Sequence, residues 1–246
     1  MASEPTPEQS YCADQARRND WDRFICALFA PSEARETLYA LIAFNAELAR
    51  TRSLVSEPML GQIRLQWWRD AIAATYDGPT ETETDASPPH PILAPLARAI
   101  RACSLNRASF DAMIDARSDE LYGGEFNDAA EVTAYAEATS GNLARLQIAI
   151  IGQGVNPADP TIHAADEVAI AWGIVELIRS GRIAPDHADD VPARIAAARL
   201  SAGGIERRFL SVLLPATLAQ TYIRRPKAGR LHRQIALGYK AFRGKF

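Results

Sequence analysis

Apolar residues recur along most of this chain with the spacing of an amphipathic helix. Two neighbouring segments carry the clearest repeats: Leu38, Leu41, Ile42, Asn45, Leu48 and Ala49 in the first, and Leu60, Ile63, Trp67 and Ile72 in the second. Ser56 and Pro58 lie between them, and both residue types are typical of a helix start. We therefore expect two long helices that meet at a short break.

The same reading predicts helices over most of the remaining chain. The expected ranges are 8–30, a helix beginning at Ser32, a tryptophan-rich helix ending at about Tyr76, and then 92–103, 107–122, 128–151, 162–179, 191–200, 204–222 and 230–242. In the first helix, Trp21, Ile25, Leu28 and Phe29 are expected to face inward. No segment alternates Val, Ile or Thr with polar residues between turn signals, so the predicted fold class is all-α.

The predicted organisation is one helical bundle over residues 8–246. Residues 1–7 are expected to be disordered. Residues 77–91, which are rich in Pro, Thr and acidic side chains, are expected to form an exposed loop because a similar helix resumes directly after them. Residues 230–246 are expected to form a basic C-terminal helix.

Composition narrows the class of protein. The 246 residues are 48% hydrophobic and 23% charged, which is typical of a soluble globular protein. The three cysteines have no metal-binding spacing, and neither a secretory signal nor an apolar run of membrane-spanning length is present. The predicted location is cytoplasmic, with peripheral contact at the inner membrane.

Charge is distributed unevenly. Tyr222–Phe246 holds eight basic residues and no acidic one, so the rest of the chain carries −11 of an overall net charge of −3. Within this basic segment, Leu231, Ile235, Tyr239, Phe242 and Phe246 form an apolar stripe at helical spacing. The stripe is interpreted either as packing on the bundle or as lying on anionic lipid. The predicted membrane or partner surface comprises Arg230, Arg233, Lys240, Arg243 and Lys245. We do not expect nucleic-acid binding, because no recognition motif is present and the remaining chain is acidic.

Several segments together resemble the squalene/phytoene synthase family over about residues 20–220. They are PSEARETLYALIAFNAELARTR, RLQWWRDAIAATYDG, FDAMIDARSDELYGGEFNDAAEVTAYAEATSGNLARL and AIAWGIVELIRSGRIAP. The resemblance implies an all-α isoprenoid synthase bundle around an apolar cavity. In active members, aspartates on two facing helices hold Mg²⁺ ions, which grip the diphosphate of a prenyl substrate during head-to-head condensation.

The chain departs from this family at both aspartate motifs. The first motif falls on Ala49, Arg50 and Ser53, and no aspartate lies between Asp22 and Asp70. The second falls on the segment from Glu176 to Ser180, followed by the segment from Gly181 to Pro185, and no aspartate lies between Asp166 and Asp186. We therefore expect no metal site and no cofactor, with Mg²⁺ needed only if prenyltransferase activity remains.

AFNAEL, VSEPMLGQIRLQWWR and AWGIVELIR resemble a narrower branch of the family that lost the aspartates. That branch includes the mitochondrial complex I assembly factor with a phytoene-synthase-like domain. The resemblance implies a catalytically degenerate binding or assembly factor, with complex I subunits or assembly intermediates as partners. The alternatives are an enzyme that acts on isoprenoid diphosphates, by head-to-head condensation or altered chemistry, and a lipid or isoprenoid carrier.

The candidate polar residues at the cavity mouth are Asn45, Glu47, Arg50, Glu176, Arg179 and Arg182. For the two glutamates three interpretations stay open. They are solvated or paired with Arg50 or Arg179, they form a salt bridge that plugs the mouth, or they belong to a residual metal site with one carboxylate from each helix. The arginines are alternatively expected to bind phosphate directly. Asp119 and Glu120 are expected either to lie at the surface or to accept hydrogen bonds from N–H groups.

Overall fold

The computed structural model of the chain describes residues 7–77, 90–123, 126–153, 157–203 and 205–246. Within these ranges it contains helices and turns but no strand, which confirms the all-α prediction. Disorder was predicted for residues 1–7, of which 1–6 lie outside the described residues. Most of the predicted loop 77–91 lies outside them as well.

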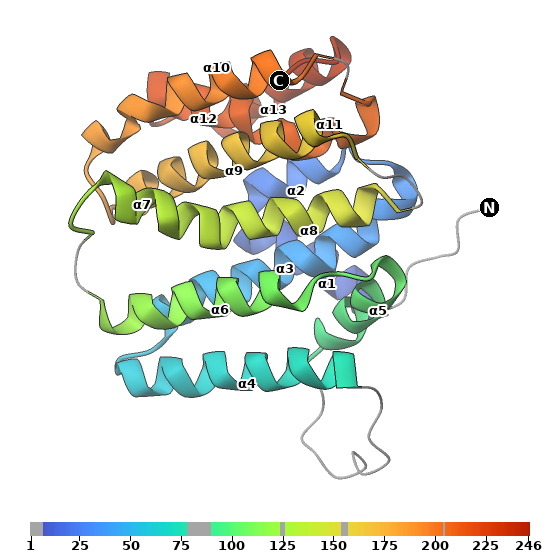
Figure 1. Cartoon of the computed structure of the whole chain (residues 1–246), viewed down its shortest axis with the longest axis vertical. Helices are drawn as coiled ribbons and strands as arrows, with labels where there is room; N and C mark the ends of the chain where they lie inside the picture. Colours follow the sequence, from blue (N-terminus) through green and yellow to red (C-terminus); the bar gives the residue numbers. More distant parts are fainter. Residues whose placement is uncertain (1–6, 78–89, 124–125, 154–156, 204) are drawn as a thin grey trace.

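Most predicted helices are present, but the ranges 8–30, 128–151 and 204–222 are each divided into shorter elements (Figure 1). The helices are α1 (Pro7–Asn19), α2 (Trp21–Ala27), α3 (Ser32–Leu54), α4 (Pro58–Asp77), α5 (Leu93–Cys103), α6 (Arg107–Tyr122), α7 (Ala129–Ala136), η1 (Glu137–Gly141), α8 (Asn142–Ile151), α9 (Asp159–Arg179), η2 (Pro185–Asp190), α10 (Val191–Ser201), η3 (Arg207–Phe209), α11 (Leu210–Leu213), α12 (Pro215–Arg224) and α13 (Arg230–Phe242).

Two helices, α3 and α9, form the centre of the bundle. Every residue from Leu38 to Leu48 in α3 and from Val168 to Val175 in α9 is buried. A helix that is buried on all sides must be surrounded by other helices. In Figure 1, α4 and α6 lie at one end of the molecule, and α10, α12 and α13 lie at the other. The two segments aligned with the family's aspartate motifs are therefore carried by the central helices.

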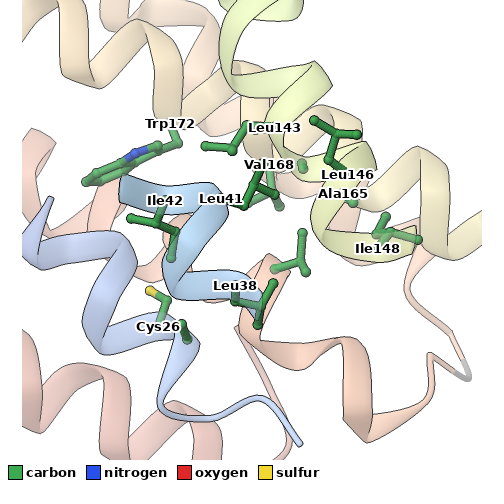
Figure 2. Packing of buried hydrophobic residues seen from close by; sticks show 14 of the residues in the cluster. Cys26, Leu38, Leu41, Ile42, Leu143, Leu146, Ile148, Ala165, Val168 and Trp172 are labelled. Carbon is green, nitrogen blue, oxygen red and sulfur yellow. The ribbon is translucent and has the colours of Figure 1, made fainter. Parts of the chain in front are cut away.

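Side chains from α2, α3, α8 and α9 meet in the core (Figure 2). The figure shows Cys26, Leu38, Ile42, Leu143, Val168 and Trp172 converging from these four helices. Trp172 is 1% exposed and Ile42 is fully buried. Burial also raises the pKa of the Cys26 thiol well above its usual value, so Cys26 packs as a small apolar group.

The first predicted helix was wrong in one respect, because 8–30 is two helices. The break falls at Asp20, whose carboxylate accepts a hydrogen bond from the backbone N–H of Arg23 at 3.1 Å and so caps α2. Helix α2 also ends at Ala27, so Leu28 and Phe29 lie in the turn after it and not on a helix face. Ile25 is buried as expected, but Leu28 and Phe29 are exposed.

Of the apolar repeat predicted for the tryptophan-rich helix, only Ile72 is buried. Helix α4 buries Gly61, Leu65, Trp68 and Ile72, whereas Leu60, Ile63 and Trp67 are exposed. The ring of Trp68 lies 5.2 Å from that of Phe44 on α3 and 5.1 Å from that of His90. Trp68 is therefore the core member of the adjacent pair, while Trp67 lies at the surface.

A π-helical turn, η1, interrupts the helix predicted over 128–151, between α7 and α8. It packs against α9 at Gly173, where an added Cβ would lie 2.9 Å from the Cβ of Ala136 and 3.1 Å from Oγ of Ser140. Glycine is required here by this close approach, which brings the Ser140 hydroxyl next to α9. Such single π turns are frequent at functional sites.

In the last third of the chain, α10 (Val191–Ser201) and α12 (Pro215–Arg224) pack against α9. The predicted helix 204–222 is instead a 3₁₀ turn followed by α11 and α12, and the chain bends at Pro215, which has no N–H to continue the first helix. None of the described helices has the length and apolar character needed to cross a membrane.

Candidate functional site

A polar cavity of about 550 Å³ opens between the two central helices and their neighbours. Helix α3 contributes Asn45, Ala49 and Arg50, and α9 contributes Trp172 and Glu176. The rest of its wall comes from the α1–α2 junction, α6, α7 with η1, and the start of α13. We call this cavity the arginine pocket, because guanidinium groups dominate its charge.

Among the described residues that line the pocket, arginines outnumber carboxylates two to one. The arginines are Arg18, Arg23, Arg50, Arg117, Arg179, Arg182, Arg230 and Arg233. The carboxylates are Asp20, Asp22, Glu120 and Glu176. The lining is therefore cationic, although the whole chain has a net charge of −3.

Arg23 holds the centre of the pocket. Its two terminal nitrogens donate to the two carboxylate oxygens of Glu176, at 2.5 and 2.6 Å, in a bidentate pair that joins α2 to α9. The same guanidinium donates to Asp20 at 2.9 Å and to the Ser140 hydroxyl at 2.9 Å. The side chain is only 8% exposed, so these bonds are largely shielded from water.

The protonation of this cluster reflects its burial. Burial and the nearby charge of Glu176 raise the pKa of Asp20 to about 6, although the Arg23 charge acts in the opposite direction. Burial alone would lower the pKa of Arg23, but Glu176 and Asp20 outweigh it and raise that pKa. Arg23 is therefore a fixed positive charge, and Asp20 is the cluster's proton-sensitive member.

Asp20 is expected to make the protein less stable as the pH rises from about 4 to about 6. Its pKa is higher in the folded chain than its ordinary value of 3.8, so the folded state binds more protons in this range, and the free energy of unfolding falls by up to about 3 kcal/mol. Urea unfolding of the wild type and Asp20→Asn across this range measures the effect. Asparagine can still cap α2.

The expected difference is a shallower pH dependence in Asp20→Asn than in the wild type. Asp14→Asn is the matched control, because it removes a carboxylate whose side chain is 40% exposed on α1. Parallel pH curves for the wild type and Asp20→Asn would contradict the assignment of this proton to Asp20.

Asp22 anchors a second ion-pair cluster, at the α13 side of the pocket. Its carboxylate accepts hydrogen bonds from the Tyr222 hydroxyl at 2.7 Å, from Arg179 at 3.2 Å, and from Arg233. The Arg179 guanidinium lies 3.8 Å from the centroid of the Tyr222 ring. Arg179 is therefore the partner of Asp22 and not of Glu176.

This cluster also corrects the predicted role of Arg233. The C-terminal helix was expected to present Arg233 to a membrane or partner, but the side chain is buried and bonded to Asp22. It joins α13 to α2, because a buried guanidinium requires a charged or polar partner. Arg233 thus belongs to the bundle and not to the outer surface.

Glu120 on α6 forms a third cluster. Its carboxylate is ion-paired with Arg182 at 2.7 Å and accepts hydrogen bonds from Arg117 at 3.2 Å and from the Tyr135 hydroxyl. Burial raises the pKa of Tyr135 to about 12, so its phenol keeps the proton that it donates to Glu120. Of the two roles expected for Glu120, the surface position was wrong because the residue is buried, whereas its carboxylate does accept from an N–H group, that of Arg117.

The six residues predicted for the cavity mouth are not all brought together. Asn45, Arg50, Glu176, Arg179 and Arg182 line the arginine pocket. Glu47 lies outside the lining and pairs with Arg64 of α4, while Arg50 approaches it at 3.6 Å. Sequence reasoning missed Arg23 and Asp22, although both stand out as charged residues inside the apolar segment Trp21–Ala27.

The interior beneath the pocket is filled by side chains. Trp172 lines the pocket, and Phe44, Leu41 and Ile42 of α3 are fully buried in the core. A smaller cavity lined by Arg23, Cys26 and Leu38 has a volume of about 20 Å³, which is room for about one water molecule. This cavity is too small for a long prenyl chain.

The sequence matches known proteins over most of its length. The sequence model of the squalene/phytoene synthase family matches residues 16–191. The protein named NADH dehydrogenase (ubiquinone) complex I, assembly factor 6 is 33% identical in Bos taurus, over 69% of this chain and 48% of that protein. Its Homo sapiens counterpart is 31% identical over the same shares of the two chains. The chain spans about half the length of the curated relatives it matches.

Solved structures share the architecture. A dehydrosqualene synthase in complex with ligand superposes with a TM-score of 0.76, at 12% identity, covering 94% of each chain. Squalene synthase HpnC from Alicyclobacillus acidocaldarius gives a TM-score of 0.67, at 15% identity, over 97% of this chain and 95% of that one. These similarities confirm the predicted isoprenoid synthase type of bundle.

Proposed function

The chain belongs to the squalene/phytoene synthase family, and we propose that it is a catalytically inactive member that acts as an assembly factor for respiratory complex I. Its curated relatives carry the name of a complex I assembly factor, and they match this chain at about one third identity. In this proposal the protein works at the inner membrane by binding complex I subunits or assembly intermediates.

One observation carries the proposal of inactivity. Each of the four described carboxylates that line the arginine pocket is ion-paired with at least one arginine. Active family members need free carboxylates at this place, because Mg²⁺ binds oxygen ligands in near-octahedral geometry. Here the same oxygens accept hydrogen bonds from guanidinium groups, and Arg50 and Ser180 occupy motif positions expected to hold aspartate.

The residues of the pocket therefore do not fit the magnesium cluster that the family implies. Within the described ranges, no group of three or more His, Cys, Asp or Glu side chains is placed to hold a metal ion. Cleavage of an allylic diphosphate develops a high negative charge on the leaving group. The arginine ion pairs instead cross-link α2, α6, α9 and α13, which favours a structural role for the charges.

The proposal predicts a specific defect when the gene is deleted from the organism that encodes it. We expect the amount of assembled complex I, measured on native gels and as NADH:quinone reductase activity of membranes, to fall several-fold. Expression of the wild-type chain should restore it, and succinate dehydrogenase activity should not change. Normal complex I content in the deletion strain would contradict the assembly role.

A second candidate, binding of an anionic isoprenoid or lipid, is favoured by the cationic lining and the volume of about 550 Å³. Arg50, with a side chain 40% exposed, occupies a position of the first family motif and is accessible to such a ligand. Arg50→Ala separates the candidates in the deletion strain. A scaffold should tolerate this change and restore complex I, whereas a protein that depends on a bound anion should fail to restore it.

A further inference from the structure

The C-terminal helix α13 presents an apolar face away from the bundle. Its buried side consists of Arg233, Leu237 and Ala241, which are spaced four residues apart. On the other side, the apolar residues Leu231, Ile235, Tyr239 and Phe242 are 71, 62, 59 and 83% exposed. With 3.6 residues per turn, these four lie nearly opposite the buried side. The interpretation that packs the stripe on the bundle was wrong for these four residues, and of the predicted stripe only Phe246 is buried.

Basic side chains surround the exposed stripe. Arg243 and Lys245 follow it at the end of α13, and Arg225 and Lys227 precede it in the turn from α12, all of them exposed. The Arg243 guanidinium donates to the Tyr239 hydroxyl at 2.9 Å, so a positive charge lies directly beside the apolar stripe. Tyr222–Phe246 contains no acidic residue, while the rest of the chain carries −11.

We propose that this face of α13 docks on an anionic lipid bilayer, with Leu231, Ile235, Tyr239 and Phe242 in the headgroup region and the basic residues against lipid phosphates. A helix of this kind lies in the interface plane, where apolar and anionic groups occur within one layer. This face of α13 is the surface through which the protein makes the membrane contact stated under the proposed function, and the inference rests on that membrane contact.

Two features favour lipid over an acidic protein as the occupant. The stripe lies on a single helix at the end of the bundle opposite α4 (Figure 1), and its four apolar side chains are all more than half exposed. Its exposed residues include two aromatic side chains, which suit the boundary between headgroups and acyl chains. The negative charge of the remaining chain orients the molecule, because an anionic surface repels its other faces.

Vesicle flotation of the full chain tests the proposal. Wild-type protein should float with vesicles of phosphatidylcholine and phosphatidylglycerol but not with vesicles of phosphatidylcholine alone, and high salt should release it. Ile235→Gln with Phe242→Gln should lower the bound fraction at least about 10-fold, because it removes apolar groups that enter the interface. Lys227→Ala with Arg243→Ala and Lys245→Ala should weaken binding on the order of 100-fold.

The matched control removes two apolar side chains of comparable exposure from the other end of the bundle. Leu60→Gln with Ile63→Gln on α4, where these side chains are 50 and 60% exposed, should leave flotation unchanged. Circular dichroism checks that every variant is folded. Wild type that does not float, or an α13 variant that floats like wild type, would overturn the proposal.

Two other results would also overturn it. Dimerisation of the wild type that is lost in Ile235→Gln/Phe242→Gln would assign the stripe to a second copy of the chain. Binding of an acidic protein in place of vesicles would assign it to a protein partner. Vesicle binding is measured without complex I. A protein that does not bind vesicles would therefore contradict the membrane surface, whereas the assembly role and the inactivity of the pocket are tested by separate experiments.

Discussion

Arg23→Met is expected to lower the free energy of unfolding by about 3–5 kcal/mol, the largest stability loss that we expect from a single charged residue. Removal of one partner from a buried ion pair leaves the other charge without compensation. Arg23 has two such partners, since Asp20 is 9% exposed at its side chain and Glu176 is 33% exposed. The more exposed Glu176 should regain some hydration, so the lower part of this range is the better expectation.

Chemical denaturation of matched variants measures this loss. Arg18→Met removes an arginine of the same pocket whose side chain is 70% exposed and which pairs with Asp14, and we expect it to cost no more than about 0.5 kcal/mol. Glu176→Gln combined with Arg23→Met should recover part of the loss, because the two changes are coupled. Equal effects of Arg23→Met and Arg18→Met would show that the Arg23 cluster is not a major source of stability.

The central helices were predictable because their signals are local. Pro31 with Ser32 marks the start of α3, and a pocket-lining arginine at position 50 could be inferred from the alignment of its neighbours with the family pattern. Leu38–Leu48 and Val168–Val175 are apolar nearly all round, which is typical of a helix buried inside a bundle. Their position at the centre then brought Arg50 and Glu176 to one cavity.

The partners of the charged residues were not predictable, because pairing depends on distant contacts. Arg23 and Glu176 are separated by 153 positions in the chain, and Arg233 and Asp22 by 211. The short segment Trp21–Ala27 contains Asp22 and Arg23 among apolar residues, and a helix of 7 residues is too short for periodicity to show which side is buried. Burial of both charges follows only from the packing of α2 against the rest of the bundle.

Helices α4 and α13 show a related difficulty. Each has apolar residues on more than one side. In α4 the repeat Leu60, Ile63 and Trp67 has the spacing of a buried face, but these residues are exposed. In α13 the packed side includes Arg233, which sequence reasoning assigned to the outside because it is charged. An ion pair with Asp22 makes burial of that side favourable, and the apolar stripe is left exposed.

The absence of prenyl diphosphate turnover is the other large effect that we expect. An active synthase must accelerate its reaction by at least about 10⁶-fold over the uncatalysed rate. That acceleration depends on divalent cations at the diphosphate, and the pocket's carboxylates are engaged by arginines instead. We therefore expect the purified chain to release pyrophosphate from farnesyl or geranylgeranyl diphosphate no faster than buffer with Mg²⁺.

The most direct test is a pyrophosphate-release assay with Mg²⁺ on the purified full chain, beside a dehydrosqualene synthase as positive control. Glu176→Gln with Glu120→Gln serves as the variant that would remove any activity belonging to the pocket. The account predicts release by the control enzyme alone and no difference between wild type and variant. Mg²⁺-dependent release that rises with wild-type concentration and disappears in the variant would contradict it.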